Sequence, residues 1–268
     1  MLPGGDTAGG WFDRRRPQLL LALTGLFGVA AAWSLFMLDD DVVAQVAVED
    51  GPVEYGGALA WLVASVVCVV AWVRARRRGR ARGIPWLLLL GFLFFFAGGE
   101  EVSWGQRLMG FETPEAVGGQ NVQGEFNLHN LEVFHATDLD GEHKAGLADW
   151  LTMEKMFALF WLSFCVLLPL GVASVRPLSR MVRRLRTPVV PIVIGLLFPL
   201  NYAIHRALEW VQSDRPQLAW PNSEVKESVF ALLFLLVAVY FLVHAARTEE
   251  ASDDDVASLR FDATRGDE

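Results

Sequence analysis

The sequence predicts an all-α integral membrane protein with six transmembrane helices, and three observations support this fold class. Of the 268 residues, 53% are hydrophobic, and they are gathered into long runs almost free of charge. Arginines are concentrated between those runs, and only two cysteines occur. This pattern excludes a soluble enzyme built around one core, a disordered chain and a disulfide-stapled secreted module.

Six segments are long enough to cross a bilayer as helices, because a hydrocarbon core of ~30 Å requires about 20 apolar residues in helical form. None of them alternates polar and apolar residues as a barrel strand would, so a helical bundle is expected. The predicted spans form one membrane domain within residues 1–247 and cover residues 18–38, 53–73, 84–105, 154–175, 188–210 and 225–245.

Arginines occupy every second connector, which predicts the orientation of the spans. Basic residues are retained in cytoplasmic loops, so both termini are expected in the cytoplasm. A cleaved signal peptide over residues 14–32 is an alternative, but the apolar run continues to Leu38 and exceeds what a signal core requires. The basic residues that set the orientation are Arg14, Arg15, Arg16, Arg74, Arg76, Arg77, Arg78, Arg80, Arg82, Arg176, Arg180, Arg183, Arg184, Arg186 and Arg247.

Residues 248–268 carry eight carboxylates and two arginines, a net charge of −6, and are expected to be a disordered cytoplasmic tail. Cys68 and Cys165 each lie within an apolar run and are expected to pack or to face lipid. No basic surface suited to nucleic acid remains once the connector arginines are assigned to topology.

Two adjacent carboxylates, Glu100 and Glu101, end the third span, where charge is costly unless it is paired, protonated, hydrated or bound to a cation. Glu100, Trp104 and Arg107 share one helical face. Glu100 and Glu101 are therefore candidate catalytic acids. In the alternative, Glu100 pairs with Arg107 beside an interfacial tryptophan, which leaves Glu101, about 100° away around the helix, without an explanation.

The fifth span places Asn201, His205 and Glu209 on one face. Residues four apart on a helix can present an imidazole and a carboxylate to one cation, so His205 and Glu209 are candidate metal ligands. In the alternative, His205 is a hydrogen-bonded packing residue and Arg206 is the partner of Glu209.

More acids and a histidine are expected on the same side of the membrane. Glu54 starts the second span, and Glu224 and Glu227 start the sixth, where the helix dipole also favours acids. Residues 121–135, inside a connector of about residues 106–153, predict a short amphipathic helix. That helix would hold His129 over the bundle, either as a lid at the interface or as a simple cover.

These groups come from spans of opposite direction, yet all are expected at the extracytoplasmic end. We therefore expect a polar cavity there, lined by Glu100, Glu101, His205 and Glu209 and covered by His129. Its substrate-binding or supporting residues would be Arg107, Trp104, Asn201, Glu54 and Glu227.

The strings EEVSWGQR (100–107), GFETP (110–114), NLHNL (127–131) and EDGPVE (49–54) resemble those of uncharacterised bacterial multi-pass membrane proteins. The resemblance covers chiefly residues 49–135. It implies a bacterial inner-membrane location and no particular activity.

Three functions fit these residues. The first is a metal-dependent hydrolase or transferase acting on a membrane lipid or lipid-linked substrate. In it, His129, His205, Glu209 and one of Glu100 and Glu101 hold zinc, manganese or iron, and the other glutamate is the general base. The second is a cation- or proton-coupled transporter that uses the same acids. The third is a non-catalytic scaffold or sensor.

Overall fold

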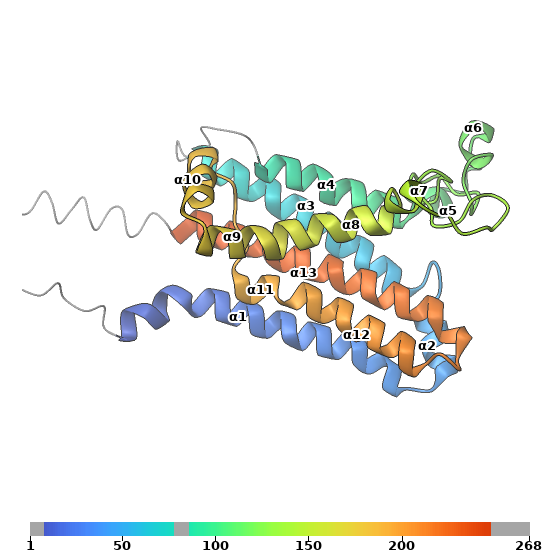
Figure 1. Cartoon of the computed structure of the whole chain (residues 1–268), viewed down its shortest axis with the longest axis horizontal. Coiled ribbons are helices and arrows are strands. Elements are labelled where there is room, and N and C mark those ends of the chain that lie inside the picture. Colours follow the sequence, from blue (N-terminus) through green and yellow to red (C-terminus); the bar gives the residue numbers. More distant parts are fainter. Residues whose placement is uncertain (1–7, 78–85, 248–268) are drawn as a thin grey trace, which may run out of the picture.

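The computed structural model describes residues 8–77 and 86–247. The acidic tail at residues 248–268 and the arginines at positions 78, 80 and 82 lie outside the described residues. Within the described ranges the chain is helical apart from turns, bends and the two isolated bridges Asn121–Leu131 and Thr137–His143. The long helices run along one axis of the molecule (Figure 1).

The elements in chain order are α1 (Ala8–Trp33), η1 (Ser34–Met37), α2 (Asp40–Val46), α3 (Pro52–Arg77), α4 (Trp86–Glu101), η2 (Ser103–Gly105), α5 (Gln106–Met109), α6 (Glu115–Gly118), α7 (Leu147–Trp150), α8 (Met153–Trp161), the π-helix η3 (Leu162–Leu167), α9 (Leu168–Ser174), α10 (Arg176–Leu185), α11 (Ile192–Gly195), α12 (Leu197–Val211), η4 (Pro216–Leu218) and α13 (Ala219–Arg247).

Four helical segments are long and apolar enough to cross a membrane: Arg16–Met37, Pro52–Arg77, Met153–Ser174 and Pro216–His244. A fifth is obtained if Trp86–Glu101 and Ser103–Met109, which meet at an angle of 67°, form one broken span. These segments coincide with the predicted first, second, third, fourth and sixth spans. The all-helical fold is confirmed, and the six-span topology stays a prediction.

The predicted fifth span, 188–210, is interrupted rather than continuous. It consists of α11 and α12, and the 15 residues of α12 give a helix of only ~22 Å at 1.5 Å per residue. Pro199 explains the break, because it lacks the N–H that would bond to the Gly195 carbonyl, and Pro188 and Pro191 precede the first residue of α11.

The break lies against the fourth apolar segment. A Cβ added to Gly195 would lie 2.0 Å from the carbonyl oxygen of Cys165, which belongs to the π-helix η3. Only glycine permits this approach of two backbones. Cys165 and Cys68 are both buried and free, so of the two expected environments, packing and lipid, the structure shows packing.

Aromatic side chains fill the centre of the bundle. Phe234 of α13 contacts the rings of Trp61, Phe94 and Phe198 at centroid distances of 5.2, 5.2 and 4.8 Å. Large apolar side chains also cover the outside, as Phe27 (76% exposed) and Leu159 (65% exposed) illustrate. An apolar exterior around a tightly packed aromatic interior is the distribution that a lipid-facing bundle requires.

The predicted amphipathic helix at residues 121–135 is wrong. That segment contains turns and the bridge from Asn121 to Leu131, and short helices occur only elsewhere in the connector. Asn121 Oδ1 accepts hydrogen bonds from the backbone N–H groups of Gln123 and Glu125, both at 3.0 Å. Such side-chain bonds compete with helix formation, and Gly124 with φ of +71° favours a turn.

The two ends of the bundle hold different elements (Figure 1). The loop end comprises α2, α5, α6, α7 and the adjoining ends of the long helices. The arginine end comprises α10, the first turns of α1 and the last turns of α3 and α13. The loop end holds the predicted site residues.

Candidate functional site

The last turn of α4 begins a group of hydrogen-bonded polar residues that we call the polar cap: Glu100, Ser103, Trp104, Arg107, Glu125 and Asn127. Glu100, Ser103, Glu125 and Asn127 are buried, and Arg107 is exposed. After Glu101 the chain turns through three consecutive residues of positive φ, Ser103, Trp104 and Gly105. Positive φ is unfavourable for the first two. Their side chains offset this cost, because Trp104 Nε1 donates to Glu100 Oε1 at 2.6 Å and Ser103 Oγ donates to Glu125 Oε2 at 2.8 Å.

Glu100 holds the connector in place. Its Oε2 accepts the backbone N–H of Leu128 at 2.6 Å and that of His129 at 2.9 Å, and it lies 3.5 Å from His129 Nδ1. Glu100 is only 6% exposed. Because both oxygens already have donors, the carboxylate acts as an anchor for the loop.

Arg107 joins two segments that are distant in the sequence. Its guanidinium forms ion pairs with Glu49 and Asp50, in the turn before α3, and with Glu125 in the connector. The hydrogen bond from Arg107 lowers the pKa of Glu49 below its ordinary value. The alternative in which Arg107 pairs with Glu100 is not observed within residues 8–77 and 86–247, because Arg107 pairs with three other acids.

Asparagine side chains complete the cap. Asn127, 2% exposed, donates from Nδ2 to Glu125 Oε2 at 2.6 Å and to Ser103 Oγ at 3.1 Å. Asn121 donates from Nδ2 to Asn127 Oδ1 at 3.0 Å. Buried polar groups that satisfy one another in this way fix a single loop conformation.

A second group, the acid cluster, consists of Glu54, Glu101, Glu224 and Glu227. These residues come from α3, α4 and α13, and Glu101 interacts electrostatically with the other three. Glu54 is 8% exposed, and its Oε2 accepts the backbone N–H of Asp50 at 2.6 Å. The side chain of Glu101 also interacts with Trp61. Adjacent glutamates therefore have different surroundings: Glu100 binds the loop, and Glu101 faces other carboxylates.

Lys226 is the cation beside the acid cluster. It is 5% exposed, and its Nζ lies 3.2 Å from Glu227 Oε1 and 3.5 Å from Glu154 Oε1. Sequence reasoning did not assign it a role, although a lysine in an apolar helix is itself a signal of function.

A third group surrounds His205, which is 4% exposed. Trp33 Nε1 donates to Asn201 Oδ1 at 2.9 Å, and Asn201 Nδ2 donates to the carbonyl oxygen of Lys226 at 3.0 Å. Within the described chain, His205 Nδ1 and Asn222 Oδ1 are buried without a hydrogen-bond partner. Two unsatisfied buried atoms from α12 and α13 are costly unless water or a ligand joins them.

The predicted metal ligands lie in separate pairs. His205 Nε2 is 3.5 Å from Glu209 Oε1, and Glu209 also pairs with the exposed Arg206, as the alternative interpretation expected. His129 pairs with Glu100 instead. In residues 8–77 and 86–247 no three His, Cys, Asp or Glu side chains are grouped to hold a metal ion. The expected arrangement of His129, His205 and Glu209 around one ion is therefore not assembled.

Fold and site define a class: a helical protein with several helices able to cross a membrane and a buried polar region at one end. Comparison with protein-family models, curated proteins and solved structures finds no match. The resemblance of residues 49–135 to uncharacterised bacterial membrane proteins is thereby neither confirmed nor refuted.

Proposed function

We propose that the protein is a multi-pass protein of a bacterial inner membrane with both termini in the cytoplasm. The four or five apolar segments support membrane insertion. The concentration of arginines at one end supports the orientation. The loop end then faces the extracytoplasmic side.

Labelling with a membrane-impermeant thiol reagent tests this orientation. Cys68 and Cys165 are buried, so they give a low background. In intact spheroplasts, Glu115→Cys at the loop end should react, and Arg180→Cys at the arginine end should react only after lysis. Reaction of the second variant in intact spheroplasts would reverse the proposed topology.

We further propose that the acid cluster takes up and releases protons and that the protein is a proton-coupled carrier of cations. One observation carries this proposal: Glu101 of α4 interacts electrostatically with Glu54 of α3 and with Glu224 and Glu227 of α13, and Lys226 Nζ lies 3.2 Å from Glu227 Oε1. Such a group is stable only if it takes up protons or binds a cation. The polar cap holds the connector against the end of α4 through the hydrogen bonds of Glu100.

Proton flux in proteoliposomes tests the carrier proposal. With a pH-sensitive dye inside the vesicles, external Na⁺, K⁺ or Mg²⁺ should drive proton movement through the native protein, and Glu101→Gln should abolish it. Glu115→Gln removes an exposed acid of α6 outside the cluster and should transport normally. Equal flux in native and Glu101→Gln proteins would reject the proposal and favour the scaffold or sensor.

A metal-dependent hydrolase or transferase remains a second candidate. It is favoured by the unsatisfied His205 Nδ1 and Asn222 Oδ1, which offer donor atoms of the kind that zinc, manganese or iron accepts. Elemental analysis of the purified protein tests it. Bound metal that disappears in His205→Ala would support the enzyme, and absence of metal from the native protein would reject it.

A further inference from the structure

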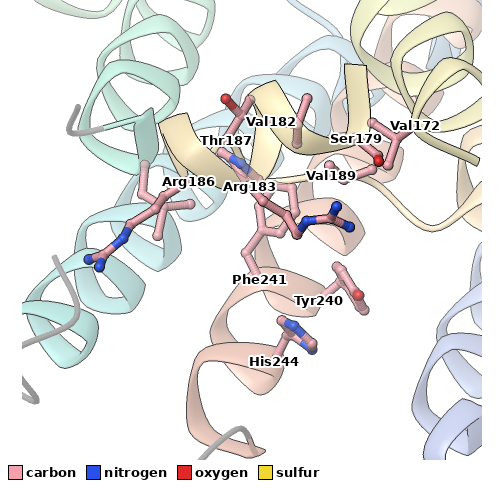
Figure 2. A pocket seen from close by; sticks show the side chains of 12 residues that line it. Val172, Ser179, Val182, Arg183, Arg186, Thr187, Val189, Tyr240, Phe241 and His244 are labelled. Carbon is pink, nitrogen blue, oxygen red and sulfur yellow. The ribbon is translucent and has the colours of Figure 1, made fainter. Parts of the chain in front are cut away.

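The arginine end contains an open cavity of about 430 Å³ between α10 and the last turns of α13 (Figure 2). Its floor includes Val182 and Phe241, both buried. Its rim includes the hydroxyl-bearing Ser179 and Tyr240 and the guanidinium of Arg183. A cavity of this volume, apolar below and polar at the rim, suits a small amphiphilic group.

The rim is positively charged and lacks acids. Figure 2 shows the Arg183 side chain extending across the cavity above Tyr240. The sequence has no Asp or Glu in residues 55–99, 155–208 or 228–248, and all the residues that line the cavity belong to these segments. Because no carboxylate lies among the residues that line the cavity, a bound anion can supply the charge complementary to Arg183.

Helix α10 is strongly amphipathic. Leu178, Met181, Val182 and Leu185 lie on one face at spacings of three and four, and Arg176, Arg180, Arg183 and Arg184 lie on the other. A short helix with an arginine face and an apolar face lies in the interface between lipid headgroups and acyl chains. The cavity thus opens at the depth where phosphate groups occur.

The surroundings of the cavity distinguish a lipid from a soluble anion. Met181 is 51% exposed and Val175, just before α10, is 47% exposed. Leu170 of α9 is 42% exposed. These exposed apolar side chains belong to α9, α10 and the residue between them, and Val172 of α9 and Ser179 of α10 line the cavity. A soluble phosphate would leave them uncovered, whereas the acyl chains of a phospholipid would bury them.

We propose that this cavity binds the phosphate headgroup of an anionic phospholipid. Arg183 pairs with the phosphate, and the apolar side chains of α9 and α10 contact the acyl chains. Basic pockets between helices at a cytoplasmic surface provide such lipid sites. The proposal is independent of the acid cluster, which lies at the loop end.

Native mass spectrometry of the detergent-solubilised full chain tests the proposal. The native protein should retain phosphatidylglycerol in preference to phosphatidylcholine. Arg183→Gln should weaken phosphatidylglycerol binding by roughly tenfold, the effect of losing one charge-assisted hydrogen bond. Arg183→Lys keeps the charge and should retain intermediate binding, because lysine lacks the bidentate geometry.

Arg180→Gln is the matched control, because it removes the same charge from the same helix at a position that does not line the cavity. Equal weakening by Arg180→Gln and Arg183→Gln would show diffuse attraction and overturn the proposal. Displacement of phosphatidylglycerol by equimolar inorganic phosphate would also overturn it, because the acyl chains would then contribute nothing. If only a variant that lacks residues 248–268 bound the lipid, the acidic tail would be the occupant of the cavity in the full chain, and the proposal would be overturned.

Discussion

The charged side chains at the two ends of the bundle have different kinds of partner. At the loop end, Arg107 meets three carboxylates and Glu100 meets two backbone N–H groups and an indole, so the charged groups stabilise one another within the chain. At the arginine end, Arg183 lies over an open cavity in segments without acids. The loop end is therefore organised by internal partners, and the arginine end is suited to external anions.

A change at the middle of the bundle should affect both ends alike, and it should have the largest effect. Gly195→Ala would place a methyl group against the Cys165 carbonyl oxygen, and we expect a loss of about 3 kcal/mol. Thermal unfolding in detergent, followed by circular dichroism, measures it. Gly56→Ala in α3 is the control, because nothing lies within 4 Å of its added Cβ. Equal stability of the two variants would show that the break between α11 and α12 tolerates bulk.

Arg107→Gln should disrupt the loop end alone. It leaves Glu49, Asp50 and Glu125 without their cation, and we expect a local cost of about 2 kcal/mol. Hydrogen exchange should accelerate in residues 106–135 and remain unchanged in α10. Arg215→Gln breaks only an exposed pair with Asp40 and should cost less than about 1 kcal/mol. Faster exchange in α10 would contradict the independence of the two ends.

Glu100→Gln and Glu101→Gln separate anchoring from the acid cluster. Glu100→Gln replaces an acceptor of two backbone N–H groups by an amide, which should cost about 1 kcal/mol and expose the connector to limited proteolysis. Glu101→Gln should leave the connector protected. Identical cleavage patterns would contradict the different roles of these adjacent residues.

Lowering the pH should produce the smallest of these changes in stability. Arg107 lowers the pKa of Glu49, so the folded chain binds fewer protons there than the unfolded chain. The resulting stability is present above the ordinary pKa of 4.5 and is lost as pH falls through the lowered value. Because Glu49 is 42% exposed, solvent reduces this contribution. NMR titration should give a pKa for Glu49 that rises in Arg107→Gln; an unchanged value would contradict the pairing.

Much of the fold follows from the sequence because a helix in lipid must bond its own backbone, and apolar length reports that requirement directly. The interruption at Gly195 was missed because hydropathy does not register the three prolines around it. The helix assigned to residues 121–135 was wrong because Asn121 bonds its neighbours' backbone, a contact that periodicity does not report.

The sequence predicted which residues lie at the candidate site, and it predicted fewer of the contacts between them. The sequence placed Glu54, Glu100, Glu101 and His205 at one end of the bundle, since helix length fixes the height of each side chain. It did not identify their partners, because those depend on rotation about each helix axis and on the path of the connector. Lys226 was overlooked for the same reason, as its carboxylate neighbours include Glu154, from the distant helix α8.

The sequence by itself determined a helical chain with membrane-length apolar segments, basic residues gathered in alternate connectors, and acids and histidines gathered in the others. Tertiary structure alone decided that Glu100 anchors a loop while Glu101 joins an acid cluster, and that His129 and His205 pair with different glutamates. The physical reason is that the length of an apolar segment and the charge of a connector depend on neighbouring residues in the sequence. Hydrogen bonds and ion pairs depend on contacts between segments that are far apart in the sequence.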